Sequence, residues 1–282
     1  MPNLLCKNRN DFQKGSCIEL SLITDRKLSF AKARNFVVYY GHGQAHAMAN
    51  YDIAIVEPAG QTEQSLKEMQ DAGTLVFAYV SITEIPEYDP LKALLREADY
   101  LKQNGKIVAN DEYRTMVADL RSSNWIGLLL HRIGGHLRNS TYDGIFMDTI
   151  SNVEWPILPA GVRAEQQAAA LELVKRIRKL HPNHLIMQNN GLEALCIETA
   201  PYIDGICWEN PDFVRPETYT WHENVRIRLK NLVATNSTRI LLLHERGTMT
   251  GPGLESSLYW AKRENYLHYV SSNHYLELDS AE

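Results

Sequence analysis

Short runs of apolar residues recur along the chain, and segments with helical periodicity lie between most of them. The runs are rich in β-branched and aromatic residues, and they are continuous rather than alternating. This pattern is typical of parallel strands that are buried on both faces. The eight predicted strands are Phe36–Tyr40, Ile53–Val56, Leu75–Val80, Met116–Leu120, Ile145–Met147, Leu185–Gln188, Ile206–Trp208 and Ile240–Leu243.

Four segments between these runs predict amphipathic helices, at Thr62–Gln70, Asn124–Leu137, Ala164–Leu180 and Thr218–Leu232. The third has apolar residues at steps of three with charged residues between them, and His181-Pro182 ends it. Eight strands with intervening helices predict an α/β fold, a single (β/α)8 TIM barrel, over a doubly wound sheet. We expect residues 1–35 to form an N-terminal extension that packs on or near the barrel, and residues 36–282 to form the barrel domain.

The composition narrows the class of protein. With 44% hydrophobic residues, the chain can bury a large core, which excludes intrinsic disorder as its main state. Its 29 Lys and Arg residues against 34 Asp and Glu give a net charge of -5 and form no basic stripe, so nucleic acid is not an expected partner. Cys6, Cys17, Cys196 and Cys207 form no C-x-x-C pair, so we expect neither a disulfide framework nor a cysteine metal site.

The sequence contains no run of about 18 apolar residues, and its first residues lack the apolar core of a signal peptide. We therefore expect no membrane association. As the sequence stands we expect a cytoplasmic protein, or a secreted one if a leader has been removed. The sequence does not indicate an oligomeric state.

Two predicted strands, the fifth and the seventh, share a template of Asp-Gly, three apolar residues and a carboxylate. They are Asp143 to Asp148 and Asp204 to Glu209. A carboxylate that follows a buried strand costs free energy unless it is paired or used. One such acid alone can equally cap a helix or form a salt bridge at the barrel rim. Two acids on alternate strands can converge across the mouth of the barrel, and glycoside hydrolysis requires this arrangement.

Other strand ends carry polar and aromatic side chains that suit a sugar ligand. Asp119 and Arg121 can equally form a structural ion pair, and the aromatic residues Trp125, Trp155 and Tyr88 can equally be packing residues. The candidate substrate-binding residues are Tyr79, Ser81, Glu84, Asp119, Arg121, Gln188, Asn189, Trp208, His244 and Glu245.

Four segments, in order along the chain, resemble the motifs of glycoside hydrolase family 114, the endo-α-1,4-polygalactosaminidases. They are Tyr79–Glu84, Val117–Arg121, Tyr142–Asp148 and Asp204–Glu209. The resemblance extends from Phe36 to the eighth predicted strand. It implies a TIM barrel without obligatory metal that hydrolyses α-1,4-linked galactosamine polymer by two acids. We expect no cofactor and a retaining reaction, and the sequence leaves inversion open because it does not supply the distance between the acids. Mapped onto this chain, it implies Asp148 as nucleophile and Glu209 as general acid/base.

The chain departs from the family pattern in two places. Thr83 stands where the family usually has glycine, and Asn110-Asp111-Glu112-Tyr113 replaces a Trp-rich stretch. If the substrate is an amino sugar, we expect additional acids such as Glu84, Asp119 or Glu245 to pair with its ammonium groups.

Several rival functions have weaker support. His42 and His46 are four residues apart, a spacing that can bind zinc on a helix, but Gly41 and Gly43 favour a loop. None of the predicted strands ends in the lysine that a Schiff base needs, and no phosphate-binding glycine motif occurs. A non-catalytic carbohydrate-binding barrel remains an alternative, as does action on a different glycan. The presence of both Asp148 and Glu209 favours an enzyme.

Overall fold

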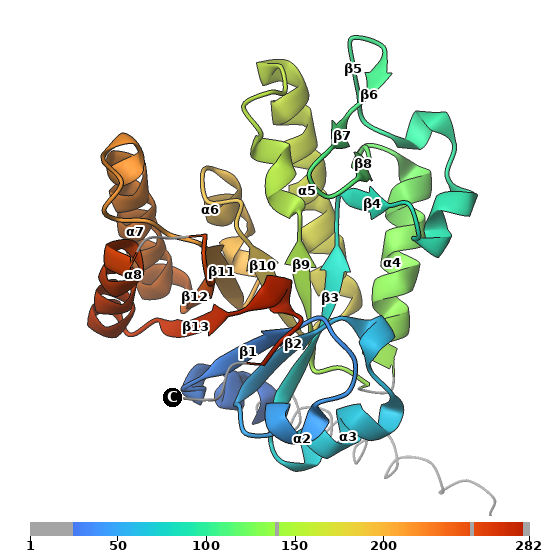
Figure 1. The fold of residues 1–282 in the computed structure, drawn as a ribbon. Coiled ribbons are helices and arrows are strands. Elements are labelled where there is room, and N and C mark those ends of the chain that lie inside the picture. Colours follow the sequence, from blue (N-terminus) through green and yellow to red (C-terminus); the bar gives the residue numbers. More distant parts are fainter. Residues whose placement is uncertain (1–24, 139–140, 249–250, 279–282) are drawn as a thin grey trace, which may run out of the picture.

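Eight parallel strands form one sheet that curls into a nearly closed barrel (Figure 1). The computed structural model describes residues 25–138, 141–248 and 251–278. The order in the sheet is β1-β2-β3-β9-β10-β11-β12-β13, and the predicted TIM-barrel class is confirmed. The strands are β1 Phe36–Tyr39, β2 Ile53–Val56, β3 Leu75–Ser81, β9 Gly144–Asp148, β10 Leu185–Asn189, β11 Gly205–Glu209, β12 Arg239–Glu245 and β13 Leu267–Ser271.

The first and last strands approach each other where the barrel closes. The rings of Phe36 on β1 and Tyr269 on β13 lie 5.7 Å apart between centroids. Just beyond these strands, the backbone N–H of Tyr40 donates to the carbonyl of Tyr275 at 2.8 Å. The second contact brings Tyr40 and Tyr275, from the two ends of the barrel domain, together at the mouth.

One of the eight predicted barrel strands was wrong. Residues 116–120 lie outside the barrel, because β8 (Thr115–Val117) pairs antiparallel with β4 (Glu84–Pro86) and β7 (Ala109–Asn110). Of the apolar residues in this run, Val117 belongs to a second, small cluster with Leu101, Val108 and Leu158, whereas Ala118 and Leu120 are buried in the main core. These strands belong to a segment, residues 82–122, that we call the insertion.

The insertion lies beside α5 and stands above the barrel in Figure 1. It also contains a two-stranded ribbon, β5 (Lys102–Gln103) with β6 (Lys106–Ile107), and two short 3-10 helices, η2 (Pro90–Leu94) and η3 (Glu97–Asp99).

The true eighth strand is β13, which no apolar run predicted. Its residues alternate between buried and half-buried positions, so the strand lacks a continuous apolar stretch. The predicted fifth and seventh strands are therefore the fourth and sixth of the barrel. Asp148 ends β9 and Glu209 ends β11, and the two strands still flank a single neighbour, β10.

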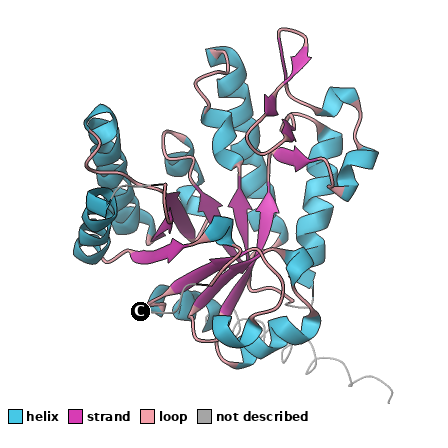
Figure 2. Cartoon of the chain, viewed as in Figure 1, coloured by secondary structure: helices cyan, strands magenta, loops and turns pink. Residues whose placement is uncertain are grey.

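Helices cover the outer face of the barrel, as Figure 2 shows in cyan. The four predicted helices occur with small differences at their ends. Thr62 begins one of them with a capping box, in which its side chain and that of Ser65 each accept a backbone N–H of the other residue. The longer helices are α3 Glu63–Asp71, α4 Ser123–Leu137, α5 Ala160–Leu180, α7 Pro216–Asn236 and α8 Gly251–Glu264. The short ones are α2 Ala45–Met48, α6 Leu195–Thr199, η1 Pro58–Gly60, η5 Ile150–Glu154, η6 Ala200–Tyr202 and η7 Asn273–Tyr275.

A helix over residues 25–32 packs at the opposite end of the barrel from Asp148 and Glu209. Its Phe30 is buried against Phe77, with the ring centroids 5.8 Å apart. A Cβ on Gly144 would lie 2.5 Å from the carbonyl oxygen of Leu185, and one on Gly205 would lie 2.9 Å from the Phe30 ring. Both glycines of the shared Asp-Gly template are therefore required by close packing at the base.

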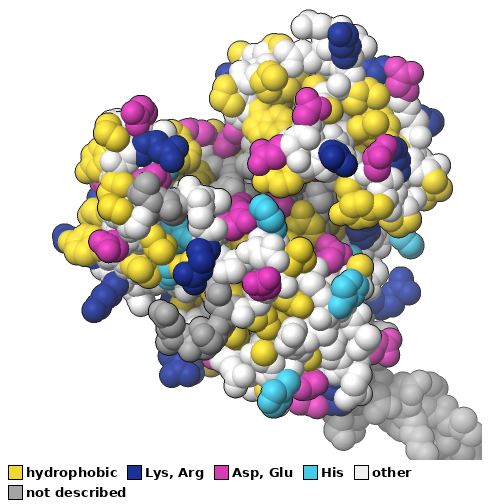
Figure 3. Space-filling model, in the orientation of Figure 1, with side chains coloured by type: hydrophobic (Ala, Val, Ile, Leu, Met, Phe, Trp, Pro, Cys, Tyr) yellow, Lys and Arg dark blue, Asp and Glu magenta, His cyan; other side chains and the backbone are white. Residues whose placement is uncertain are grey.

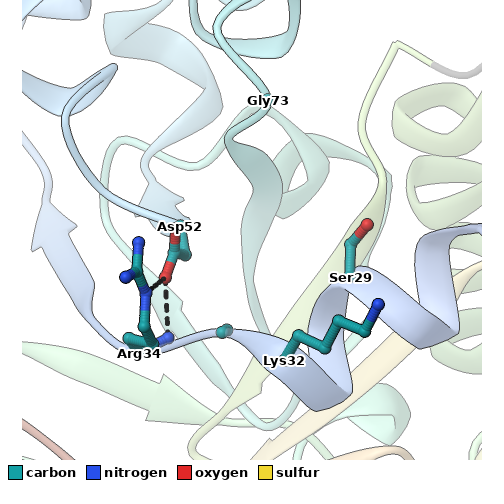
Figure 4. A pocket seen from close by; sticks show the side chains of 6 residues that line it. Ser29, Lys32, Arg34, Asp52 and Gly73 are labelled. Atoms are coloured by element: carbon teal, nitrogen blue, oxygen red, sulfur yellow. Dashed lines mark hydrogen bonds and ion pairs between the residues drawn. The ribbon is translucent and has the colours of Figure 1, made fainter.

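The two aspartates of the template hold the base together. Asp143 accepts the backbone N–H of Val76 at 3.0 Å, and Asp204 accepts that of Ile186 at 2.9 Å. Each also pairs with the helix over residues 25–32, through Arg26 at 2.9 Å and Lys27 at 3.4 Å respectively. The pocket in Figure 4 lies at this same end, where the backbone N–H and the guanidinium of Arg34 contact Asp52.

Among the described residues, no helix is long and apolar enough to cross a membrane. Cys196 and Cys207 are buried free thiols. Cys6 and Cys17, and most of the predicted N-terminal extension, lie outside the described residues.

Candidate active site

The mouth of the barrel is hollowed between two flanking sides. Figure 3 shows the hollow between the side formed by α7 and α8 and the side formed by α5 and the insertion, with acidic side chains (magenta) within it. Asp148 and Glu209, as the last residues of β9 and β11, lie at the ends of the strands that line its floor.

A single side chain joins the two acids. Asn189, the last residue of β10, donates its amide N–H groups to Asp148 Oδ1 at 2.7 Å and to Glu209 Oε2 at 3.2 Å. These two carboxylate oxygens are therefore at most 5.9 Å apart, the sum of the two distances. Asn189 is buried, and its own carbonyl oxygen has no hydrogen-bond partner among the described residues.

Further side chains donate hydrogen bonds to each acid. Tyr79 on β3 donates its hydroxyl to Asp148 Oδ2 at 2.8 Å. Tyr275, in the 3-10 helix after β13, donates to Glu209 Oε1 through a short hydrogen bond. Asn190 donates to Glu209 Oε2 at 3.4 Å and accepts the Glu209 backbone N–H at 3.1 Å. Both carboxylates are held by hydrogen bonds from side chains on separate elements.

Burial raises the pKa of Glu209, and the charge of Asp148 raises it further. The hydrogen bonds from Tyr275 and Asn189 act in the opposite direction, because they favour the ionised form. The net effect keeps a proton on Glu209 to a higher pH than on an ordinary glutamate. A group of this kind can act as a general acid.

Three of the predicted site residues face away from the hollow. Successive side chains of a strand point to opposite faces, so the residue before each rim side chain faces the surrounding helices. Gln188 accepts a hydrogen bond from Thr199 of α6 at 2.8 Å. Trp208 stacks on a histidine of α7, and His244 bonds to a serine of α8 at 2.7 Å. Their neighbours Asn189, Glu209 and Glu245 occupy the rim instead.

Four other predicted site residues hold the insertion in place. The buried carboxylate of Glu84 accepts three side-chain hydrogen bonds, from Asn110, Thr115 and Asn152, at 2.6 to 3.0 Å. Ser81 donates to the carbonyl of Glu84 at 2.7 Å. Asp119 and Arg121 form an ion pair at 2.6 Å, as the structural alternative anticipated.

Glu245, the last residue of β12, lies at the rim and contributes to the raised pKa of Glu209 through its charge. One of its oxygens, Oε1, accepts the backbone N–H of His274 at 3.1 Å and lies 2.8 Å from the imidazole Nδ1 of the same residue.

Sequence reasoning missed the side chains that the loops bring to the mouth. These are Tyr40, Tyr113 and Tyr275. Tyr113, in the turn between β7 and β8, is 65% exposed, and its pKa is raised by partial burial and by the charges of Glu112 and Glu209. An aromatic residue in a polar turn was the available signal for it.

Metal-binding geometry is absent from the described part of the chain, where no group of three or more His, Cys, Asp or Glu residues could hold an ion. His46 lies in the short helix α2, beside Glu68 at 3.7 Å, and His42 lies in the turn before that helix.

Comparison with known proteins points to one family. The model of the glycoside-hydrolase family GH114 matches residues 24–214, more than half of the chain. Among solved structures, the glycoside hydrolase domain of PelA from Pseudomonas aeruginosa has a TM-score of 0.71 at 17% identity, over 87% of this chain and 97% of that one. Aspergillus fumigatus Ega3 in complex with galactosamine has a TM-score of 0.64 at 13% identity, over 85% and 91%.

A third similar structure is the α-galactosidase TtGalA from Thermus thermophilus in complex with stachyose, with a TM-score of 0.59 at 11% identity, over 87% and 62%. A search among curated proteins found no match. At these identities the solved structures support the fold, and the family model identifies the family.

Proposed function

Because the chain belongs to glycoside-hydrolase family GH114, we propose that it is a retaining, endo-acting hydrolase of α-1,4-linked galactosamine-type polysaccharide. The observation that carries this proposal is the bridge that Asn189 makes between Asp148 and Glu209. Retaining glycosidases hold their two carboxyls about 5 to 5.5 Å apart, whereas inverting ones leave roughly 6.5 to 9.5 Å for a water molecule. The two oxygens that Asn189 bridges are at most 5.9 Å apart, a closeness that is compatible with retention.

At the start of the proposed reaction, the two acids have different protonation states. Glu209, whose pKa is raised, donates its proton to the glycosidic oxygen as the bond to the leaving sugar breaks. Asp148, held by Tyr79 and Asn189, attacks the anomeric carbon and forms a covalent glycosyl-enzyme. Glu209, now ionised, takes a proton from water, and the resulting hydroxide displaces Asp148 with a second inversion.

The proposed substrate rests on family membership and on charge. Ega3, which has a similar fold, was solved with galactosamine bound. The mouth of this chain carries Asp148, Glu209 and Glu245, and the protein has a net charge of -5. De-N-acetylated galactosamine carries ammonium groups that such a site attracts. We therefore expect the de-N-acetylated polymer to be cleaved faster than the acetylated one.

The first test measures release of reducing ends from de-N-acetylated and acetylated α-1,4-galactosamine polymer. Wild type is compared with Asp148→Asn and Glu209→Gln. We expect cleavage by wild type and a loss of about 10³-fold or more in both variants. If folded wild type cleaves neither polymer, the galactosamine proposal fails. Binding of either polymer without cleavage would then support a non-catalytic carbohydrate-binding barrel.

A second test separates the two roles. With an aryl α-galactosaminide and azide, Asp148→Gly is expected to yield the β-azide, because azide replaces the missing nucleophile and inverts the configuration once. Glu209→Gly is expected to yield the α-azide, because azide then attacks the covalent intermediate and inverts it a second time. The opposite pair of products would exchange the two assignments. An inverted sugar released by wild type, detected by NMR of the fresh product, would contradict retention.

A further inference from the structure

Tyr275 lies outside the residues that match the family model, yet its hydroxyl contacts Glu209. Its side chain is buried. Its O–H donates to Glu209 Oε1, whereas the other carboxylate oxygen, Oε2, receives only the longer hydrogen bonds from Asn189 and Asn190, at 3.2 and 3.4 Å. The two oxygens of the acid thus have different surroundings.

The backbone that presents Tyr275 is strained. Asn273, His274 and Tyr275 have φ values of 50°, 52° and 65°, three consecutive residues in the left-handed region, and none is glycine. This conformation is unfavourable for side chains with a Cβ, and least favourable for bulky ones such as tyrosine. Strain of this kind persists only where the surrounding structure enforces it, and it concentrates at functional sites.

Contacts from two barrel strands enforce the strained conformation. The Tyr40 backbone N–H, just after β1, donates to the Tyr275 carbonyl at 2.8 Å. Glu245 on β12 accepts the His274 backbone N–H at 3.1 Å. The tyrosine rings are also packed together. The Tyr40 ring lies edge-on to the rings of Tyr79 and Tyr275, with centroid distances of 4.9 and 5.2 Å. Tyr79 and Tyr275, the donors to the two acids, are therefore packed against one shared ring.

We infer that Tyr275 is a positioning residue that holds Glu209 Oε1 as a hydrogen-bond acceptor, so that Oε2 carries the transferable proton. This inference rests on the proposed function. Oε2 is the oxygen on the side of Asn189 and Asp148, where the scissile bond would lie. When Glu209 gives up this proton, the Tyr275 O–H stabilises the resulting carboxylate. When Glu209 regains a proton from water, the same O–H directs it back to Oε2.

Other ionisable groups also act on Glu209, so the test must isolate Tyr275. The groups near Glu209 are Asp148 on β9, Cys207 on β11, Glu245 on β12, Tyr40 after β1 and Tyr113 in the insertion. Tyr275→Phe removes the O–H and keeps the ring against Tyr40, and thus leaves those groups in place. Tyr266→Phe is the matched control, because Tyr266 is also buried and its hydroxyl has no partner among the described residues.

The experiment follows the side-chain carboxyl carbon of Glu209 by NMR in protein labelled with ¹³C-glutamate, with Glu209→Gln to assign the signal. This readout requires no substrate. In Tyr275→Phe we expect the Glu209 titration to move to higher pH, because a hydrogen bond to the ionised form is lost. In Tyr266→Phe we expect no movement. With 3,5-difluorotyrosine at position 275, a stronger donor, we expect a movement to lower pH.

Kinetics complete the test. Tyr275→Phe is expected to lower kcat about 10- to 100-fold with little change in KM, and to move the alkaline limb of the pH profile upward together with the NMR titration. An unchanged titration in Tyr275→Phe would overturn the inference, even if wild type cleaves the polymer. A shifted titration in a protein that cleaves no galactosamine polymer would instead overturn the proposed function and leave the link between Tyr275 and Glu209 standing.

Discussion

Replacing Asn189 by leucine tests whether the bridge between the acids supports catalysis. When both acids are ionised, at pH above the pKa of Glu209, two full charges about 6 Å apart repel each other by about 3 kcal/mol at an effective dielectric constant of about 20. Hydrogen bonds to charged groups contribute about 1.5 to 3 kcal/mol each, so the two from Asn189 are large enough to offset that repulsion. Asn189→Leu removes both hydrogen bonds and keeps the number and the branching of the side-chain heavy atoms.

We expect kcat/KM of Asn189→Leu to fall about 100-fold, the equivalent of about 3 kcal/mol of transition-state stabilisation. The Asn189 hydrogen bond lowers the pKa of Glu209, and its loss therefore raises that pKa. Because the protonated form of Glu209 is the active acid, the alkaline limb of the pH profile should move to higher pH. The assay is reducing-end release measured across the pH range.

Stability separates this effect from damage to the fold. Leucine also removes a buried carbonyl oxygen that has no hydrogen-bond partner among the described residues, which recovers about 1 to 3 kcal/mol. Against the two lost hydrogen bonds, about 3 to 6 kcal/mol together, this leaves a net loss of about 0 to 5 kcal/mol in the free energy of unfolding. The matched control is Thr199→Val, which removes a buried hydroxyl from the helix layer behind β10, bonded to Gln188 and Leu195 at 2.8 Å. It should lower stability by about 1 to 2 kcal/mol and leave kcat/KM unchanged. Wild-type activity in Asn189→Leu, or a limb that moves to lower pH, would refute the reasoning.

Three further predictions concern stability, each measured by urea unfolding. Glu84→Ala should lower the free energy of unfolding by about 3 kcal/mol, because the buried donors Thr115 and Asn152 and the half-buried donor Asn110 lose their acceptor. An unchanged value would return Glu84 to the list of substrate contacts. Gly144→Ala should cost at least about 2 kcal/mol, because the new Cβ would lie 2.5 Å from the backbone oxygen of Leu185, which has little room to move. Burial alone would raise the pKa of Asp99, but hydrogen bonds hold that pKa below its ordinary value. The ionised Asp99 therefore stabilises the folded protein above about pH 4, and this contribution is lost as the pH falls further. Asp99→Asn should therefore be less stable than wild type at pH 7, and the difference should shrink at pH 3.

The continuous apolar runs located seven of the eight barrel strands, since parallel strands buried on both faces require them. The same criterion failed for β13, which has alternating burial. It also selected the run at residues 116–120, because a segment outside the barrel that is buried against the main core and against a second, small cluster needs apolar residues too. A continuous apolar run indicates that a strand is buried, but it does not indicate which sheet the strand joins.

Runs that are apolar on both faces also conceal which side chains point into the barrel. Once Glu209 is taken to face the mouth, alternation alone assigns its neighbour Trp208 to the helix layer. Choosing between Gln188 and Asn189 needs the register between strands, in which Gln188 lies opposite Met147 of β9. That register depends on packing between distant segments, so the sequence of β10 alone could not identify the bridging residue.

The shared template of β9 and β11 combines two separate requirements. Its Asp-Gly end serves the base of the barrel, where each aspartate accepts a backbone N–H of the preceding strand and each glycine leaves room for close packing. Its carboxylate end serves the mouth. Because three residues of strand separate the two ends in both cases, the base contacts also fix how far Asp148 and Glu209 reach into the hollow. A change at Asp143 or Asp204 should thus disturb the acids through the position of the strand, without touching the site.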